Sequence, residues 1–513
     1  MAFGSATAFH GGKLTVSARR AAAFFEDPAL ASVRLTWASP GERTRIVKVL
    51  DAVEPRAKGA GGGVVFPGFL GSPLAQGSGE THVLRGVAVV VAGFLPRAQE
   101  GLIEMSGPGQ DLSPLGRTHN LVVEFVPADG AAWEDVDAAL RRGQLALARY
   151  VAQATAGARP DEAEEAPAPG GGGDGLPRIG AVTNLQTQGT FKDVFVYGRS
   201  FAGSMPALVE AAEIADGAVV SGQFGHPGLK NPTIVHQNHP VVAALRARDG
   251  VDLRFAGVVL SPEPVEQARK ELVSANAAKL VASLGWDAAI VTKEGGGNAD
   301  SDMALKMDAL EDLGVTAVGI FAEMSGPEGT GPPLVSPPAR AKTIVSSGNY
   351  DERITLPAVE RALGGDTFAL ADAPATSELD LPVAVVYMSL GCLGWGRLTS
   401  RPSDGVVAMP EPEHKPAGPV RVVHYINQFF GGVGGEEHAG TAPELREGPV
   451  GPGRKLSALL GDAGEVVATV VCGDDYAAST EGAAAEIVEL IRRADPDVVV
   501  AGPAFTSGRY GIA

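Results

Sequence analysis

Two polar stretches follow strand-like segments in the middle of the chain. Residues 293–302 read KEGGGNADSD directly after IVT, and residues 346–349 read SSGN directly after TIV. Glycines let backbone N–H groups approach a ligand, while Glu294 and Asp300 offer hydrogen-bond acceptors or a positioned base. The alternative is that Asn298 and Asp300 only cap the helix that follows, a place that Asn and Asp favour anyway. Both interpretations stay open from these residues.

Histidine and cysteine give weaker signals. VHQNHP places His236 and His239 three residues apart, but no HExxH pattern or acidic residue stands nearby, so turn or capping histidines are favoured over a metal site. Cys472 follows the strand-like EVVATVV, which would place its thiol either at the carboxyl edge of a sheet or in the core. Cys392 stands among apolar residues and is expected to be core. We find no GxGxxG or Walker A pattern, so nucleotide binding is not predicted.

The elements that would position these residues alternate between strand and helix. This alternation over residues 179–400 predicts a doubly wound parallel sheet, in which ligands bind outside the carboxyl ends of the strands. The expected strands are 179–184, 217–221, 253–260, 287–292, 315–321 and 342–346, and the expected helices are 263–284, 302–313 and 355–363.

Two stretches rich in Pro, Ala, Glu and Gly, residues 156–178 and 401–419, are typical of linkers. Before the first, residues 1–155 show β-type runs and then one helix at about 131–155, which predicts an α+β or mainly β domain. After the second, residues 420–513 predict one βαβ unit that opens a sheet without completing it. The expected fold class is therefore α/β.

Composition narrows the classes of function. The chain has 513 residues, a length that favours about three domains, and its net charge of −18 without a basic run argues against nucleic acid or an anionic membrane as partner. Two cysteines exclude a disulfide framework and a Cys-based zinc site, and fit a cytoplasmic location. The most apolar stretch, residues 381–396, is shorter than a membrane span of about 20 residues and is broken by glycines, so we expect a buried element. The first residues lack the layout of a signal peptide.

Whole segments of the chain resemble a known family. WASPGERTRIVKVLDAVEPR, VVFPG, GSGETHVL and IEMSGP, followed by VTNLQTQG, ADGAVVSG, KEGGGNADSD and TIVSSGN, resemble the substrate-specific proprotein of component B of the glycine, sarcosine and betaine reductases, to which the D-proline reductase proprotein is related. RVVHYINQFFGGVGGEEHA, REGPVGPG, VVATVVCGDDY and AGPAFTSGRYG resemble the amino-terminal end of the selenoprotein subunit of the same component. Two subunits that are usually separate chains would then be fused.

The resemblance implies reductive cleavage of a carbon–nitrogen bond. In this family a selenocysteine attacks the α-carbon of the substrate, expels the amine and keeps the carboxymethyl group, and a thioredoxin-type system supplies electrons. The implied substrate is betaine, sarcosine or glycine, and the implied partners are selenoprotein A, component C and the thioredoxin system, in an oligomer without a metal. The alternative is a non-catalytic small-molecule-binding or scaffold protein descended from such a reductase.

One departure from the family concerns its pyruvoyl group. The family's proprotein cleaves itself shortly after a Ser-Gly pair, before a cysteine that becomes pyruvoyl. Here Ser221 and Gly222 are followed by Gln223 and Phe224, and Phe224 has no nucleophile at Cβ for the acyl shift. We therefore predict an uncleaved chain, no pyruvoyl group and no other cofactor in this chain. Betaine, whose nitrogen needs no Schiff base, is slightly favoured as the substrate.

A second departure is that the resemblance to the selenoprotein covers only its first ninety or so residues. Cys472 is the only thiol in that part, and a cysteine would be a slower nucleophile than selenocysteine. Our hypothesis is that a selenocysteine codon was read as a stop, which would place the missing nucleophile directly after Ala513.

The residues carried over from matching motifs are few. Arg56 is the leading candidate for holding a substrate carboxylate through paired N–H bonds, and a surface salt bridge is the alternative for it. The full set is Cys472 as the catalytic residue, and Arg56, His82, Glu294, Asn298, Asp300 and Gly348 as substrate-binding residues.

Overall fold

The chain forms two compact units, Met1–Val407 and Ala408–Ala513. The computed structural model describes residues 1–59, 76–96, 98–164, 175–187, 194–222, 225–329, 334, 336–395, 398–402, 419–434, 436–480 and 482–502. Phe224 and the chain end at Ala513 lie outside these residues. The mixture of strands and helices confirms the predicted α/β class. The predicted separation of residues 1–155 from 179–400 into domains stays a prediction, and both stretches belong to the first unit.

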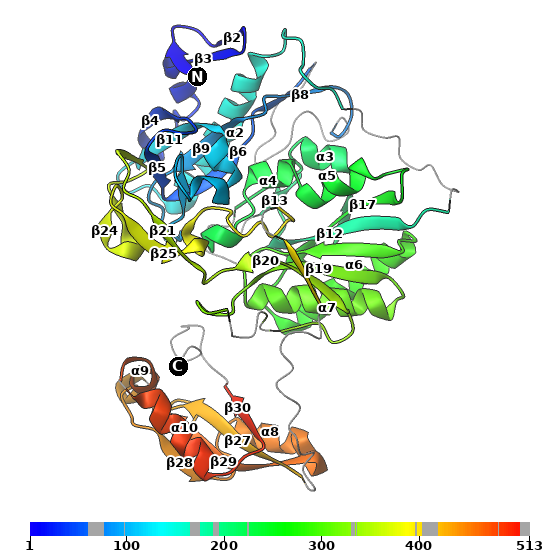
Figure 1. Ribbon diagram of the computed structural model, residues 1–513, viewed down its shortest axis with the longest axis vertical. Coiled ribbons are helices and arrows are strands. Elements are labelled where there is room, and N and C mark those ends of the chain that lie inside the picture. The colour runs from blue at the N-terminus through cyan, green and yellow to red at the C-terminus, as the bar shows by residue number, and fades with distance from the viewer. Residues whose placement is uncertain are drawn as a thin grey trace. The chain divides into compact units, whose positions relative to one another are not determined.

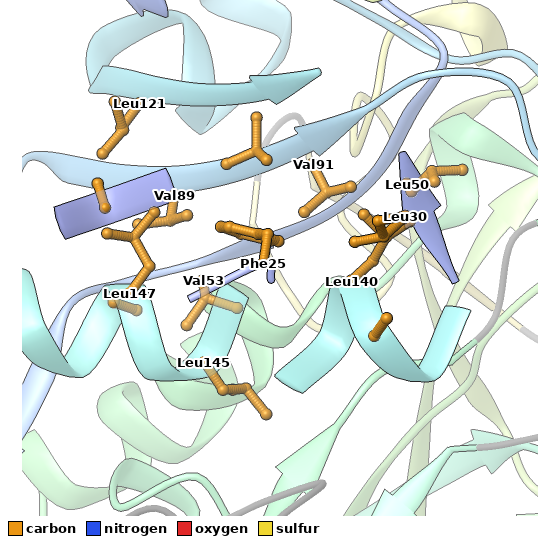
Figure 2. Packing of buried hydrophobic residues seen from close by; sticks show 14 of the residues in the cluster. Phe25, Leu30, Leu50, Val53, Val89, Val91, Leu121, Leu140, Leu145 and Leu147 are labelled. Carbon is orange, nitrogen blue, oxygen red and sulfur yellow. The ribbon is translucent and has the colours of Figure 1, made fainter. Parts of the chain in front are cut away.

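A four-stranded sheet and one long helix dominate the start of the first unit. In spatial order the strands are β4 (Leu30–Ala38), β11 (His119–Pro127), β9 (Val87–Ala92) and β6 (Val49–Val53). The helix α2 (Trp133–Gln153) packs its Leu140 and Leu147 close to Val89 and Val91 of β9, as Figure 2 shows. The β-type runs and the helix predicted at 131–155 are thus confirmed.

Every residue of β9, VAVVVA, is buried, because both faces of its sheet are covered. Val89 and Val91 face α2, while Ala88 and Val90 pack in a second cluster that includes Ile234 and Tyr387 from later in the chain. Further short elements here are β1 (Ala2–Gly4), β2 (Ala8–His10), β3 (Lys13–Ser17), α1 (Ala18–Ala23), β7 (Arg56–Lys58) and β8 (Thr81–Val83).

The central sheet of the first unit has seven strands, of which the inner five are parallel. In spatial order they are β15 (Ala207–Val209), β17 (Arg254–Glu263), β12 (Arg178–Gln186), β18 (Ala288–Thr292), β19 (Thr316–Glu323), β20 (Thr343–Asn349) and β26 (Thr399–Pro402). The two edge strands, β15 and β26, run antiparallel to their neighbours.

Helices cover both faces of this sheet, as the doubly wound prediction requires (Figure 1). On one side lie α6 (Gln267–Ser283) and α7 (Asn298–Asp312). On the other lie α3 (Ala211–Ala215), α4 (Thr233–Gln237) and α5 (Pro240–Ala247). β17 runs on through Glu263, where a helix was expected to begin, so this carboxylate stands at the end of a strand.

Two predictions in this part are wrong. Residues 355–363 form no helix but two strands, β21 (Arg353–Leu356), which pairs with β25 (Leu379–Pro382), and β22 (Arg361–Leu363). A helix is disfavoured here because Pro357 restricts the backbone of the residue before it to extended conformations. The strand β22 pairs with β5 (Thr44–Val47), and β5 also pairs with β10 (Leu102–Glu104).

The strand expected at 217–221 does not join the central sheet. Only Val219–Val220 form a strand, β16, in a small sheet with β13 (Phe195–Val196) and β14 (Arg199–Ser200). Gly217 has a φ of +88° and makes a left-handed turn just after α3, and beyond it only Val219 and Val220 pair with β13. A further antiparallel pair in the described part of the first unit consists of β23 (Thr367–Phe368) and β24 (Ala373–Pro374).

The second unit contains the predicted βαβ unit. Its sheet has the spatial order β28 (Glu444–Glu447), β29 (Gly464–Cys472), β27 (Val420–Asn427) and β30 (Val498–Ala501), the last three parallel. Its helices are α8 (Gly453–Leu460), α9 (Asp474–Ser479) and α10 (Ala483–Arg493). Ile487 of α10 packs with Val470 and Cys472 in the core of this unit.

Across the part of the chain that the structure describes, no helix has the length and apolarity needed to cross a membrane. The apolar stretch at 381–396 is buried, as predicted, through side chains such as Tyr387, Leu390 and Leu393.

Candidate functional site

The glycine-rich loop between β18 and α7 fits tightly over the carboxyl ends of the strands. Gly295 and Gly297 have φ values of +69° and +70°, in the left-handed region that favours glycine. A Cβ on Gly295 would lie 2.8 Å from Oε1 of Gln186, and a Cβ on Gly296 would lie 2.6 Å from Sδ of Met324. The glycines are therefore needed both for the turn and for close packing.

The structure brings three predicted residues, Glu294, Asn298 and Asp300, together around this loop. α7 begins at Asn298 after Gly297, without a side-chain cap, and the Asp300 carboxylate accepts a hydrogen bond from Nζ of Lys293. The interpretation of Asp300 as only a helix cap is therefore wrong. The Asp300 side chain is 1% exposed and the Lys293 side chain is fully buried, so this ion pair forms part of an internal polar cluster.

On the α4 side of the sheet, Glu294 faces a histidine. Its Oε2 accepts a hydrogen bond from the backbone N–H of Gln186 at 2.9 Å, and its Oε1 lies 3.7 Å from Nε2 of His236. Neither Oε1 nor Nε2 has a hydrogen-bond partner among the described residues. Because a buried polar atom without a partner costs free energy, these two atoms are candidates for hydrogen bonds to a ligand.

The neighbouring His239 has the capping role that the sequence favoured. Its Nδ1 accepts a hydrogen bond from the N–H of Val242 at the start of α5, and its Nε2 lies 2.9 Å from Oγ1 of Thr183. Burial, with a smaller contribution from His236, lowers the pKa of His239 to about 3, so the ring is neutral at physiological pH.

On the α6/α7 side, further charged residues are buried at the same edge. Nζ of Lys270 binds the carboxylate of Asp302, and Nζ of Lys306 lies 3.6 Å from the other oxygen of that carboxylate. Oε1 of Glu263 accepts a hydrogen bond from the N–H of Glu294 at 3.2 Å. Burial and the negative charges of Asp302 and Glu294 raise the pKa of Glu263 well above its ordinary value, while burial lowers that of Lys306.

Sequence reasoning missed Glu263, Lys270 and Lys306. The sequence contains one indication of Lys306, which interrupts the apolar face that Met303 and Met307 form on α7. A lysine on such a face is rarely buried without a charged partner, so a buried ion pair could have been expected there.

A second group of polar residues ties α4 to the amino-terminal sheet. The Asp51 carboxylate accepts hydrogen bonds from both the N–H and the hydroxyl of Thr233, at 3.0 and 2.6 Å. The N–H of Ser221 donates to the same hydroxyl at 3.1 Å, and Arg141 donates to the Ser221 carbonyl. Both the N–H and the carbonyl of Ser221, just before residues 223 and 224, are thus held by hydrogen bonds.

Lys230 is buried near this group. Burial lowers its pKa to about 8, and the negative charge of Asp51 opposes this shift.

Arg56 lies in the interior and is engaged by the protein itself. It donates to Glu54 at 2.7 and 3.1 Å, to the carbonyl of Ala215 at 2.7 Å and to Oδ1 of Asn238 at 2.6 Å. The ion pair is buried rather than on the surface, since both side chains are 5% exposed. Arg56 lines a cavity of about 20 Å³, room for one water molecule. Its role in binding a substrate carboxylate stays a prediction.

The other two predicted binding residues lie further from the glycine-rich loop in the chain. His82 lies on β8, which pairs antiparallel with β7, and its Nε2 lies 3.2 Å from a carboxylate oxygen of Glu80. Gly348, the penultimate residue of β20, has a φ of +124° and donates its N–H to Oγ of Ser346 at 3.2 Å, and the Ser346 hydroxyl in turn donates to Glu323. Gly348 therefore belongs to the same edge of the sheet, on the side of β19 and β20.

Cys472, the predicted nucleophile, is fully buried in the second unit. Its Sγ lies 3.6 Å from the carbonyl of Gly473, and burial raises its pKa to about 11. Such a thiol is protonated at neutral pH, where only the thiolate is a strong nucleophile. Its catalytic role stays a prediction. Cys392 is core, as expected, and burial raises its pKa to about 11 as well.

Comparison with known proteins places most of the first unit in one family. The model of the glycine/sarcosine/betaine reductase component B subunits matches residues 1–378. Over 387 residues the chain is 36% identical to the glycine reductase complex component B subunits alpha and beta of Peptoclostridium acidaminophilum, covering 72% of this chain and 89% of that protein. It is 34% identical to the sarcosine reductase complex component B subunit alpha of the same organism, and the match covers 66% of this chain and 80% of that protein. No solved structure matches the chain.

The second unit matches a different subunit. The family model of glycine/sarcosine/betaine reductase selenoprotein B covers residues 419–513. Over 95 residues the chain is 64% identical to the glycine reductase complex component B subunit gamma of Symbiobacterium thermophilum, which is 18% of this chain and 22% of that protein. The chain therefore belongs to the family of glycine/sarcosine/betaine reductase component B subunits, with a selenoprotein B-type segment fused behind its first unit.

Proposed function

We propose that this protein is the amine-binding subunit of a cytoplasmic reductase complex, and that it binds glycine, sarcosine or betaine at the carboxyl edge of the central sheet. The observation that carries the proposal is the pair of unpartnered buried atoms, Nε2 of His236 and Oε1 of Glu294, 3.7 Å apart beside the glycine-rich loop. A bound amine or carboxylate would supply the missing hydrogen bonds.

In the proposed reaction a selenolate or thiolate of the complex attacks the α-carbon of the substrate. A bond from selenium or sulfur to carbon forms, the carbon–nitrogen bond breaks, and its electron pair leaves with the amine. The carboxymethyl group stays on the nucleophile until partner proteins accept it. We propose selenoprotein A, component C and a thioredoxin-type reductant for these later steps. The residues of this chain bind and orient the substrate.

The residues present do not fit a pyruvoyl group. The anchored backbone at Ser221 leads into Gln223 and Phe224, and neither side chain can become a pyruvoyl carbonyl. We therefore route no step through such a group, and the substrate is held by side chains alone.

A calorimetric titration of the full chain with glycine, sarcosine and betaine tests the proposal. At least one of the three is expected to bind, and Glu294→Gln is expected to weaken that binding about tenfold or more, because it removes a charged acceptor from a buried site. Glu271→Gln, on the exposed surface of α6, is the matched control and should bind like the parent protein. If none of the three amines binds, the proposed function is wrong.

One observation favours a second candidate function, a binding or scaffold protein without catalysis of its own. The buried, protonated thiol of Cys472 is poorly suited to attack a substrate. This candidate predicts the same amine binding, but no release of amine when the reductant and partner proteins of a related complex are added.

A further inference from the structure

Three polar residues of the β6–β7 segment, Asp51, Glu54 and Arg56, hold both ends of the short helix α4, and we call them the α4 clamp. At the start of α4, the Asp51 carboxylate accepts hydrogen bonds from the N–H and the hydroxyl of Thr233, at 3.0 and 2.6 Å. At its end, the N–H of Glu54 donates to Oε1 of Gln237 at 3.0 Å, and Nε2 of Gln237 donates to the Glu54 carbonyl at 3.4 Å.

Arg56 completes the clamp at the carboxyl end of α4. It donates to Oδ1 of Asn238 at 2.6 Å, and both Arg56 and Nδ2 of Asn238 donate to Oε2 of Glu54, at 2.7 and 3.1 Å. The side chains of Glu54 and Arg56 are each only 5% exposed. Because the three groups are bonded to one another away from water, they fix the residues that follow His236 against the β6–β7 segment.

His236 stands between these two anchored ends of α4. Its Nε2 lies 3.7 Å from Oε1 of Glu294, and both side chains are 1% exposed. A movement of roughly 0.8 Å would bring the two atoms to hydrogen-bond distance. Such a contact would be favourable, because it satisfies two buried atoms and the acceptor is a carboxylate. The gap therefore persists only because the protein holds both partners in place.

The Glu294 side of the gap is held as well. Oε2 of Glu294 accepts a hydrogen bond from the N–H of Gln186 at 2.9 Å, and the Glu294 N–H donates to Oε1 of Glu263 at 3.2 Å. These bonds tie Glu294 to the ends of β12 and β17. On the other side of the gap, the several hydrogen bonds of the α4 clamp oppose the single one that closing the gap would form.

We propose that Asp51, Glu54 and Arg56 are positioning residues of the amine site, and that by clamping α4 they keep His236 out of direct contact with Glu294, so that both atoms stay available to a ligand. The inference rests on the proposed function and adds to its site a part of the amino-terminal sheet. Binding groups that are fixed before the ligand arrives give tighter binding, because less order is lost on association.

This role differs from the one that the sequence suggested for Arg56. A residue that binds a substrate carboxylate needs N–H groups free to reach the ligand, whereas Arg56 directs its N–H groups to Glu54, Asn238 and the carbonyl of Ala215. Arg56 thus acts on the site through α4, without touching the ligand.

NMR of the histidine side chains in the ligand-free full chain tests the positioning directly. Gln237→Met removes both side-chain bonds to Glu54 without changing a charge, and the double variant Arg56→Met/Glu54→Met removes the buried ion pair as a unit. In both, the imidazole nitrogen resonances of His236, assigned with His236→Gln, should move because the ring pairs with Glu294. The movement should be much smaller in a Glu294→Gln background, where the carboxylate is absent.

A buried ion pair elsewhere in the first unit provides the matched control. Arg45 and Glu104 are paired with both side chains fully buried, and Arg45→Met/Glu104→Met removes that pair without touching α4. This control should leave the His236 resonances in place. By calorimetry, the two clamp variants should bind the amine that the parent protein binds about fivefold or more weakly, while the control binds it like the parent.

The outcomes separate this inference from the proposed function. His236 resonances that stay in place in the clamp variants, or move equally in the control, overturn the positioning role. Gln237→Met decides this even where the double variant fails to fold. If the resonances move as expected but the amine affinity is unchanged, the clamp does not serve the amine site. If the resonances move and no amine binds to the parent protein, the proposed function fails while the clamp on His236 stands.

Discussion

Nε2 of His236 and Oε1 of Glu294 face each other at 3.7 Å, with both side chains only 1% exposed. The distance is too long for a hydrogen bond, and a buried pair of this kind is usually closed by direct contact or by a bridging group. The two residues come from α4 and from the loop after β18, so the gap joins two elements that are far apart in the chain.

If one ligand group bridges this gap, the two residues act as a unit. His236→Gln and Glu294→Gln should each weaken amine binding about tenfold. The double variant should lose less binding free energy than the sum of the losses in the two single variants. A double-mutant cycle measured by calorimetry gives the coupling. Additive losses would show that the two side chains do not share an occupant.

Arg56 is expected to matter first for stability. Arg56→Met would leave Glu54 buried without its ion pair, and we expect it to lower the free energy of unfolding by about 3–5 kcal/mol in urea denaturation. The double variant Arg56→Met/Glu54→Met removes both charges and should recover much of this loss. A single variant of undiminished stability that no longer binds an amine would instead support the carboxylate-binding role.

His239 should make the first unit sensitive to acid. The pKa of His239 is about 3 in the folded protein and about 6.5 when unfolded, so between these values the unfolded state binds the extra proton. Stability is fully present above pH 6.5 and falls as the pH drops, by about 2 kcal/mol between pH 6.5 and 5.

His239→Asn tests this, since asparagine is also a good helix cap but does not titrate. Urea denaturation at pH 7 and pH 5 should show a smaller acid loss for the variant than for the parent protein. Equal losses in both proteins would assign the acid sensitivity to other groups.

Cys472 should react slowly in the folded protein. With a pKa of about 11, only about one thiol in a thousand is ionised at pH 8, and the side chain is fully buried. In a Cys392→Ser background, alkylation by iodoacetamide followed by mass spectrometry should be much slower in buffer than in urea. Rapid alkylation of the folded chain would show an accessible thiolate, and would strengthen the catalytic assignment.

Because residue 224 is phenylalanine, we expect the chain to be uncleaved. The intact mass of the purified protein should equal that of the continuous polypeptide, because Phe224 has no nucleophile at Cβ to start the acyl shift at that position. Phe224→Cys restores the thiol and is the informative comparison. A break between residues 223 and 224 in the parent protein would overturn the prediction.

Much of the fold was accessible from local patterns. Runs such as VAVVVA in β9 and the alternation from β17 to α7 reflect burial on both faces and short connections, which sequence shows directly. The strand β22 was missed because its partner, β5, lies some three hundred residues earlier, and no local pattern records that pairing.

The candidate site was predicted only in part, for a related reason. Glu294, Asn298 and Asp300 share one motif, so their proximity could be expected from the loop alone. Glu263 was assigned to the start of a helix, and Lys306, although it interrupts the apolar face of α7, gives no indication in the sequence of which residues it meets. Their meeting depends on strand register and on how α7 packs over β17, which are tertiary properties.

The short helix α4 has a consequence for chain integrity. Thr233, Gln237 and Asn238 bind Asp51, Glu54 and Arg56 on one side, and His236 faces Glu294 on the other. The polypeptide on either side of Gly222 is therefore interlocked by contacts that do not run through the peptide bond. A chain cut at that point would therefore yield two pieces that these contacts still hold together.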